Sequence, residues 1–301
     1  MVLRGRAEYN VPMSFTTDQM EPVLRDNLEF TGITHCHRIP GGYSRYTYSI
    51  GLDKNTFVFQ IHTPPDDMPA SPDNSALHLL YPGGADNTRA ANRLLEQCAI
   101  RVPKTVFSND SKRHLPYRCV LTDFIPIDCY NGMEQHRHNA TLNEFLFDFG
   151  VSISKLKHYK RNCPGEVHDS AQEFDPVSAV YDVALSLLSD APGHTFVHEN
   201  REMIRSTLTS LRKKLTPKDN FHIIHSDIKP DNFRFDADGN IYWVDNESLQ
   251  YFDMEFELAQ CMIPEFSVLN TAEFLQGYFY NWNVSIDEDR LRYYKIYWCI
   301  A

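Results

Sequence analysis

The stretch IIHSDIKPDNFRFDADGNIYWVDNESL, residues 223–249, places two aspartates and an asparagine between apolar runs that are typical of strands. FHII before His225, then NFRF and IYWV, each predict a short strand, and DADG between the last two predicts a hairpin turn. Such a hairpin brings Asn232 and Asp245 together at its open end, with Asp227 in the loop just before. Because an unpaired carboxylate beside buried strands is costly, the pattern indicates a bound cation.

Magnesium fits this set of oxygen-bearing side chains. It takes oxygen ligands, typically one or two protein groups together with substrate phosphates. Asn232 and Asp245 would supply the protein ligands, and Asp227 could accept a proton from an attacking hydroxyl. The alternative interpretation is a polar loop whose side chains cap backbone amides. The aspartate that follows the predicted hairpin favours the metal site.

The composition limits the class of protein. The chain has 301 residues, 42% of them hydrophobic, which is enough for a buried core in one or two domains. Its net charge of −11 argues against a surface that tracks nucleic acid, so we expect no nucleic-acid partner. An acidic balance suits a cationic small molecule or serves solubility.

The seven cysteines show no C-x-x-C spacing, which argues against a disulfide framework and a zinc ribbon. They are typical of reduced thiols, so we expect a cytoplasmic protein. The first residues lack the apolar core of a signal peptide. No apolar run approaches the ~18 residues of a membrane span, so we expect no membrane association.

The distribution of expected elements predicts an α+β fold with a strand-rich first part and a helix-rich second part. Thr17 is a candidate N-cap, and the pair Asp175-Pro176 is typical of a helix start. A hairpin is expected around Asp53-Lys54-Asn55. Helices are expected at residues 17–30, 86–98, 141–159, 175–190 and 199–215, and a strand within residues 117–128.

The motifs IIHSDIKPDNFRF and IYWVDNE resemble the catalytic and metal-binding loops of protein-kinase-like phosphotransferases. They are most similar to the branch of aminoglycoside phosphotransferases and choline kinases. The resemblance implies that Asp227 is the catalytic base and that His225 supports its loop. It also implies that Asn232 and Asp245 bind magnesium.

A segment further along is similar to the D-P-x-x-D-L-A pattern of the same family. FDMEFELA, residues 252–259, retains the first aspartate as Asp253 and has Glu257 in place of the second. In HSDIKPDN, Lys229 resembles the lysine of protein kinases, where it could contact the transferred phosphoryl group or pair with Asp231. However, VDNE lacks the glycine of the protein-kinase D-F-G motif, and few residues follow it. A small-molecule acceptor is therefore favoured over a protein.

Two upstream segments are candidates for nucleotide binding. GGYSRYTYSI occupies the place of the nucleotide loop, where Gly41, Gly42 and Ser44 could bring backbone amides to phosphate. An ordinary hairpin turn explains that stretch equally well. VLTDFIPID resembles the hinge whose backbone would meet adenine. The hinge residues are Thr122, Asp123, Phe124 and Ile125.

The family pattern fails at the third strand, where a lysine or arginine normally reaches the nucleotide phosphates. TFVFQIH has Gln60 in that place, and the following helix offers only Asp86, Asn87 or the late Glu96 as the usual partner. Loss of both members of an ion pair is self-consistent, because one buried charge alone would be costlier than none.

This departure leaves two interpretations. Either Arg45, Lys54 or His62 supplies the missing charge, or the protein is a nucleotide-binding pseudoenzyme. Since the base and both metal ligands are present, an active enzyme is favoured. A protein kinase is the less favoured alternative.

The resemblance implies a bilobal protein-kinase-like fold. We expect a nucleotide-binding lobe over residues 1–124, with an antiparallel sheet, and a mainly helical catalytic and acceptor-binding lobe over residues 125–301. ATP, or another nucleoside triphosphate, and magnesium would lie between them, and the γ-phosphoryl group would pass to a hydroxyl of a small molecule. Specificity would reside in residues 130–215 and near the C-terminus. Acidic residues there would suit an amine-bearing acceptor, although ordinary surface charge explains them equally well.

Overall fold

The computed structural model describes residues 15–39, 45–62, 79–80, 85–109, 111–128, 142–169, 174–263, 269–282 and 284–301. These residues form two compact units. The N-terminal unit contains the described residues up to 62, Ala85 and Asp86, and those from Val102 to Pro126. The C-terminal unit contains the remainder.

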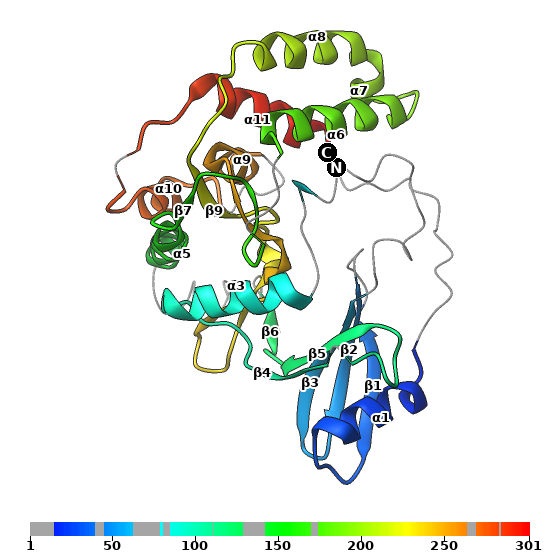
Figure 1. Ribbon diagram of the computed structural model, residues 1–301. Helices are drawn as coiled ribbons and strands as arrows, with labels where there is room; N and C mark the ends of the chain where they lie inside the picture. The colour runs from blue at the N-terminus through cyan, green and yellow to red at the C-terminus, as the bar shows by residue number, and fades with distance from the viewer. Residues whose placement is uncertain are drawn as a thin grey trace. The chain divides into compact units, whose positions relative to one another are not determined.

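The N-terminal unit is built on a five-stranded antiparallel sheet with the strand order β1-β2-β3-β5-β4 (Figure 1). Strands β2 and β3 form the expected hairpin, with Leu52 opposite Asn55 and with Asp53 and Lys54 in the turn. The elements are α1 (Thr17–Asn27), β1 (Ile33–Ile39), β2 (Arg45–Leu52), β3 (Asn55–His62), β4 (Thr105–Asn109) and β5 (Arg118–Asp123).

Helix α1 covers one face of this sheet. It begins after Thr16 rather than after the expected cap Thr17, because the Gln19 side chain accepts the Thr16 backbone N–H at 2.8 Å and closes a capping box. Met20 and Leu24 of α1 are fully buried in the core against the sheet. The sheet residues of this core include Tyr46, Tyr48, Phe59, Ile61, Cys119 and Leu121.

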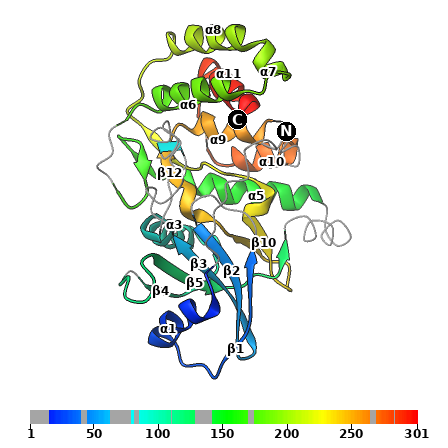
Figure 2. The same ribbon diagram turned by 90° about the vertical axis from the view of Figure 1, so that its right-hand side faces the viewer.

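The C-terminal unit is mainly helical. Its helices α6, α7, α8 and α11 gather at one end in both views (Figures 1 and 2). The helices are α3 (Ala85–Gln97), which enters this unit at Asn87, α5 (Leu142–Leu156), α6 (Pro176–Asp190), α7 (Phe196–Glu199), α8 (Arg201–Arg212), α9 (Met254–Cys261), α10 (Ala272–Tyr278) and α11 (Glu288–Ile300), with the short 3-10 helices η2 (Pro230–Asn232) and η3 (Asn246–Ser248).

Two small antiparallel sheets complete this unit, with the orders β11-β10-β6 and β7-β9-β12-β8. Strand β12 follows the predicted hairpin and pairs with β9, Leu249 opposite His225, which the sequence did not predict. The strands are β6 (Ile127–Asp128), β7 (Lys160–Arg161), β8 (Gly165–Glu166), β9 (Phe221–His225), β10 (Phe233–Phe235), β11 (Ile241–Trp243) and β12 (Leu249–Phe252).

Aromatic packing fixes the hairpin β10–β11 within the C-terminal unit. The ring of Phe233 lies 4.4 Å from that of Phe149 on α5 and 5.4 Å from that of Trp243, both centroid to centroid. Trp243 also contacts the His225 ring at 5.8 Å. Because these rings are buried, they hold the strands that flank the loop after β9 in place.

The antiparallel sheet and the mainly helical second unit confirm the expected α+β class. The predicted start of α6 is also confirmed, since Asp175 Oδ2 accepts the Ser178 backbone N–H at 3.0 Å. Among the described residues, none of the helices combines the length and the apolar character that crossing a membrane requires.

Candidate active site

The loop after β9 brings three of the predicted residues into direct contact. Asp227 Oδ2 lies 2.6 Å from Lys229 Nζ and accepts a hydrogen bond from Asn232 Nδ2 at 3.1 Å. Asn232 Nδ2 also donates to the Asp227 backbone carbonyl at 2.7 Å. Asp227 Oδ1 makes no hydrogen bond or ion pair with a described residue, and 28% of the side chain is exposed. One carboxylate oxygen is therefore held and the other is available.

The hairpin places Asp245 beside the same loop. Phe233 lies opposite Trp243, and the Val244 N–H donates to the Asn232 carbonyl at 2.9 Å, one residue before Asp245. Asp245 adopts a left-handed backbone conformation, with φ at 62°, which turns the chain into η3. The predicted convergence of Asn232 with the end of the hairpin is thus present in the backbone.

Lys229 pairs with Asp227, the predicted base, rather than with Asp231. Burial by itself would lower its pKa, but the carboxylates of Asp227, Asp245 and Asp231 outweigh that effect and raise it. The ammonium group therefore stays charged among these acids. It offsets part of the negative charge that would otherwise repel nucleotide phosphates.

His225 is fully buried beneath the loop. Its Nδ1 is 3.3 Å from the Asp227 backbone nitrogen and 3.3 Å from Ser248 Oγ, and burial lowers its pKa. The neutral imidazole accepts the Asp227 N–H and so fixes the backbone that carries the Asp227 carboxylate. This contact agrees with the supporting role that the resemblance implied.

A buried charged network holds the other side of the loop, and the sequence did not predict it. Glu257 Oε1 accepts the His225 backbone N–H at 2.7 Å, while Oε2 accepts from Tyr278 at 2.8 Å and pairs with Lys157 Nζ. Lys157 also donates to the Ile223 carbonyl at 2.9 Å. Glu257 and Lys157 are fully buried and one hundred residues apart, so the sequence did not indicate their pairing. The one local signal was Glu257 itself, which stands where the family pattern has an aspartate.

Helix α3 anchors the segment that follows Asp245. Asn87 Nδ2 donates to the carbonyls of Glu247 and Leu249 at 2.6 and 2.9 Å, and its Oδ1 accepts the Val167 N–H at 2.8 Å. Asn92 Oδ1 accepts from Asn246 Nδ2 at 2.9 Å. Helix α3, where the family pattern would place the partner of the strand cation, thus supplies polar anchors for the candidate metal-binding segment.

The sheet of the N-terminal unit gathers several predicted nucleotide-binding residues on the face opposite α1. Directly opposed residues share a face, and Gln60 lies opposite Thr47 and Val120, next to the row Arg45–His62–Arg118. Thr122 lies on the same face, opposite Val58.

The other predicted residues of this unit lie at different places. Asp123 ends β5, where its N–H donates to the Lys104 carbonyl at 3.0 Å, and Phe124 and Ile125 follow it. Lys54 lies in the turn at the far end of the β2–β3 hairpin from Gln60. Gly41, Gly42 and Ser44 lie outside the described residues.

The donor set at the loop fits magnesium. Asn232 directs its amide nitrogen at Asp227, so its Oδ1 would be the atom that binds a metal, and Asp245 would add a carboxylate. Among the described residues no group of three or more His, Cys, Asp and Glu side chains is placed to hold a metal. A site with two oxygen donors suits a cation that takes its remaining ligands from phosphates and water.

Comparisons with known proteins identify the family of the chain. Residues 35–294 match the model of the Phosphotransferase enzyme family, so the chain belongs to that family. A search of curated proteins found no match.

Solved structures share the protein-kinase-like fold. A spectinomycin phosphotransferase, APH(9)-Ia, in complex with ADP and spectinomycin is 15% identical, with a TM-score of 0.63, over 96% of this chain and 86% of its own. The aminoglycoside phosphotransferase APH(4)-Ia is 10% identical, with a TM-score of 0.58, over 95% and 90%. The choline kinase LicA from Streptococcus pneumoniae is 13% identical, with a TM-score of 0.57, over 94% and 88%. The protein is therefore a member of the Phosphotransferase enzyme family with a protein-kinase-like fold.

Proposed function

We propose that the protein transfers the γ-phosphoryl group of ATP, or of another nucleoside triphosphate, to a hydroxyl group of a small molecule, with magnesium as the metal ion. One observation carries the proposal most strongly. Asp227 has one carboxylate oxygen held by Lys229 and Asn232, while the other is available at a partly exposed position. ADP in the spectinomycin phosphotransferase complex supports the choice of nucleotide.

The proposed chemistry needs little more than positioning and charge. Asp227 Oδ1 accepts the proton of the acceptor hydroxyl as its oxygen forms a bond to the γ-phosphorus. The bond between that phosphorus and the oxygen bridging to the β-phosphate breaks, and the nucleoside diphosphate leaves. Lys229 and Asn232 contact the other oxygen, Oδ2, and so hold the carboxylate in its orientation.

Asn232 and Asp245 would hold magnesium. When bound, the ion neutralises negative charge on the nucleotide phosphates. In this proposal neither magnesium nor the nucleotide is bound by the side chains of His225, Glu257 and Asn87. These side chains instead fix the backbone on both sides of the site. They are positioning residues in this proposal.

We propose that the N-terminal unit contributes the nucleotide-binding residues and the C-terminal unit the catalytic ones. The backbone of Thr122, Asp123, Phe124 and Ile125 would meet adenine, and Gly41, Gly42 and Ser44 would meet phosphate. Of the three candidates for the missing strand cation, Arg45 and His62 are favoured, because they lie in the row next to Gln60. Lys54 is not favoured at the distant turn.

We place this activity in the cytoplasm. None of the six cysteines in the described ranges forms a disulfide, which is consistent with a reducing compartment.

The experiment is a phosphoryl-transfer screen of a metabolite and antibiotic library with ATP and magnesium. Asp227→Asn should lower turnover by about 10²–10⁴-fold, because the amide cannot accept the proton. Asp238→Asn is the matched control, since this carboxylate is exposed in the β10–β11 turn, and it should retain parental activity. Equal turnover by Asp227→Asn and the parent would contradict the assignment of the base.

A nucleotide-binding pseudoenzyme is the second candidate, and Gln60 is the observation that favours it. Binding of ATP with magnesium, without turnover of any hydroxyl compound, would support this alternative. Phosphate incorporation into proteins or peptides, but not into small alcohols, would instead indicate a protein kinase.

A further inference from the structure

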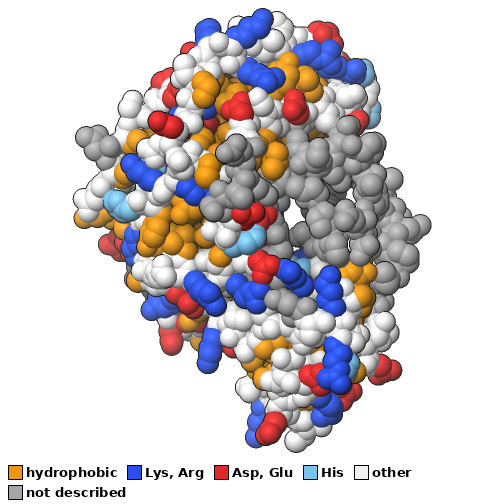
Figure 3. All heavy atoms as spheres, viewed as in Figure 1, with side chains coloured by type: hydrophobic (Ala, Val, Ile, Leu, Met, Phe, Trp, Pro, Cys, Tyr) orange, Lys and Arg blue, Asp and Glu red, His pale blue; other side chains and the backbone are white. Residues whose placement is uncertain are grey.

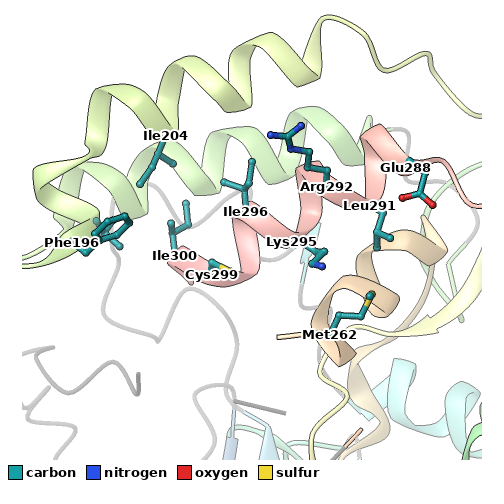
Figure 4. A pocket seen from close by; sticks show the side chains of 11 residues that line it. Phe196, Ile204, Met262, Glu288, Leu291, Arg292, Lys295, Ile296, Cys299 and Ile300 are labelled. Carbon is teal, nitrogen blue, oxygen red and sulfur yellow. The ribbon is translucent and has the colours of Figure 1, made fainter. Parts of the chain in front are cut away.

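A pocket of about 500 Å³ lies in the C-terminal unit, among α7, α8, α11 and the residue that follows α9 (Figure 4). That volume is within the range of sites for small organic molecules. The elements come from the two parts of the chain in which acceptor specificity was expected, before residue 215 and near the C-terminus. Nothing in the catalytic arrangement above uses this pocket.

The walls of the pocket are mainly apolar. Ile204 of α8 and Ile296 and Ile300 of α11 line it, and Phe196 of α7 stands at its edge with 70% of its surface exposed. Figure 3 shows hydrophobic side chains at the surface over these helices, at the top of the view. A large exposed ring beside an apolar hollow is typical of a surface that an apolar ligand covers.

The polar groups of the pocket are mainly basic. Helix α11 contributes Arg292 and Lys295, three residues apart, and Glu288 one turn earlier. In Figure 4 Arg292 and Lys295 extend to opposite sides of α11, Lys295 toward Met262. Neither cation forms an ion pair with a described residue. The lining therefore carries an excess of one positive charge in a chain whose net charge is −11.

Helix α9 connects the pocket to the catalytic loop. The Gln260 side chain accepts the Ile228 N–H at 3.0 Å, next to Asp227. Met262, two residues beyond Gln260, lines the pocket. One end of the pocket is thus joined to the loop that carries the proposed base by a short run of chain.

We propose that this pocket binds the acceptor, and that the acceptor is a small molecule with an apolar body and an anionic group such as a carboxylate. The inference rests on the proposed phosphotransferase function and names its substrate class. Arg292 and Lys295 attract the anionic group, while the isoleucines and Phe196 cover the apolar body. The same two cations disfavour an amine-bearing acceptor, which the acidic composition had suggested.

The test uses a pair of fluorescent probes that share a ring system. 8-Anilinonaphthalene-1-sulfonate carries an anionic group, whereas N-phenyl-1-naphthylamine lacks it. The double variant Arg292→Gln/Lys295→Gln should weaken binding of the anionic probe about tenfold. It should leave binding of the neutral probe within about twofold, since the apolar walls are unchanged.

Three further variants distinguish an effect of the pocket's charge on probe binding from an effect of altered folding. Glu288→Gln should tighten binding of the anionic probe about threefold and leave the neutral probe within about twofold, whereas partial unfolding would increase binding of both probes. Ile296→Trp should weaken both probes by filling the pocket, and Lys214→Gln, which removes an exposed cation outside the pocket, should change neither. Unchanged affinity for the anionic probe in the double variant, or equal loss for both probes, would overturn the inference.

A transfer assay distinguishes this inference from the proposed function. Hydroxyl-bearing aromatic carboxylates should be phosphorylated, and the double variant should raise their KM about tenfold with little change in kcat. Phosphorylation of amine-bearing alcohols alone, unaffected by the double variant, would overturn the substrate class and leave the phosphotransferase standing. Binding of the anionic probe as expected, without transfer to any alcohol, would overturn the proposed function.

Discussion

Gln60 is the residue at which this chain departs furthest from its family's pattern. On the same face of the sheet, the pair of opposed residues next to Thr47 and Gln60 is Arg45 and His62. Arg118, which pairs with Asp86, completes the row of Arg45 and His62. A cation can therefore reach the surroundings of Gln60 from the neighbouring strand β2 instead of from β3.

Whether Arg45 replaces the family's strand cation can be tested by removing its charge and placing a lysine at position 60. Arg45→Gln should weaken binding of the magnesium complex of AMP-PNP about tenfold, and adding Gln60→Lys should restore most of that loss. Isothermal titration calorimetry measures both steps. Lys54→Gln serves as the control and should have no effect. A loss of affinity in Lys54→Gln that equals the loss in Arg45→Gln would contradict the assignment.

The ion pair of Lys157 and Glu257 yields a second prediction at this scale. Lys157→Met leaves the Glu257 carboxylate buried with Tyr278 and the His225 N–H as its partners, so the free energy of unfolding should fall by about 3–5 kcal/mol. Glu257→Gln combined with Lys157→Met should recover more than half of that loss, because no uncompensated charge remains. Urea denaturation of both single variants and the double variant measures the coupling. Strictly additive losses would show that the two groups act independently.

At the scale of elements, α3 joins distant segments of the C-terminal unit through Asn87. Asn87→Ala leaves two carbonyls and one N–H without their partner, which should lower the free energy of unfolding by about 2–4 kcal/mol. Because these bonds hold the segment after Asp245, the magnesium-dependent part of nucleotide binding should weaken as well. Glu96→Ala, at an exposed position of the same helix, is the control. Destabilisation without any change in nucleotide binding would limit α3 to a structural role.

The elements also show which features local sequence can predict. The hairpin β10–β11 and the loop before it were predicted because their signals, alternation and a glycine-tipped turn, lie within thirty residues. The anchors Asn87 and Lys157 were not, because their partners lie far along the chain, and neither was strand β12, one of whose two neighbours, β8, lies more than eighty residues away. The start of α1 moved by one residue because two neighbouring threonines can both cap a helix, and Gln19 selects the first.

For the whole molecule, buried histidines couple stability to pH. Burial lowers the pKa of His222 and of His225 below the usual 6.5, so these rings stay neutral in the fold while the unfolded chain takes up protons. Stability should therefore be fully present above about pH 6.5 and should decline as the pH falls below it, by at most about 1.4 kcal/mol per pH unit for each ring.

Urea unfolding at pH 7.0 and 5.5 measures this slope. His222→Gln should reduce it by removing one of the two rings, whereas His158→Gln, at an exposed position, should leave it unchanged. An identical slope in the parent and in His222→Gln would contradict a contribution of His222 to the pH dependence.

The buried pair beneath the catalytic loop also restricts how this sequence can evolve. Glu257 spans the distance between the His225 N–H and Lys157 Nζ, and the aspartate of the family pattern is shorter by one methylene group. A direct return to aspartate would withdraw the carboxylate from one of these two groups and strand it in the interior. Loss of Lys157 alone would in turn leave the Glu257 carboxylate uncompensated, so descendants of this chain are expected to keep both residues or to replace both.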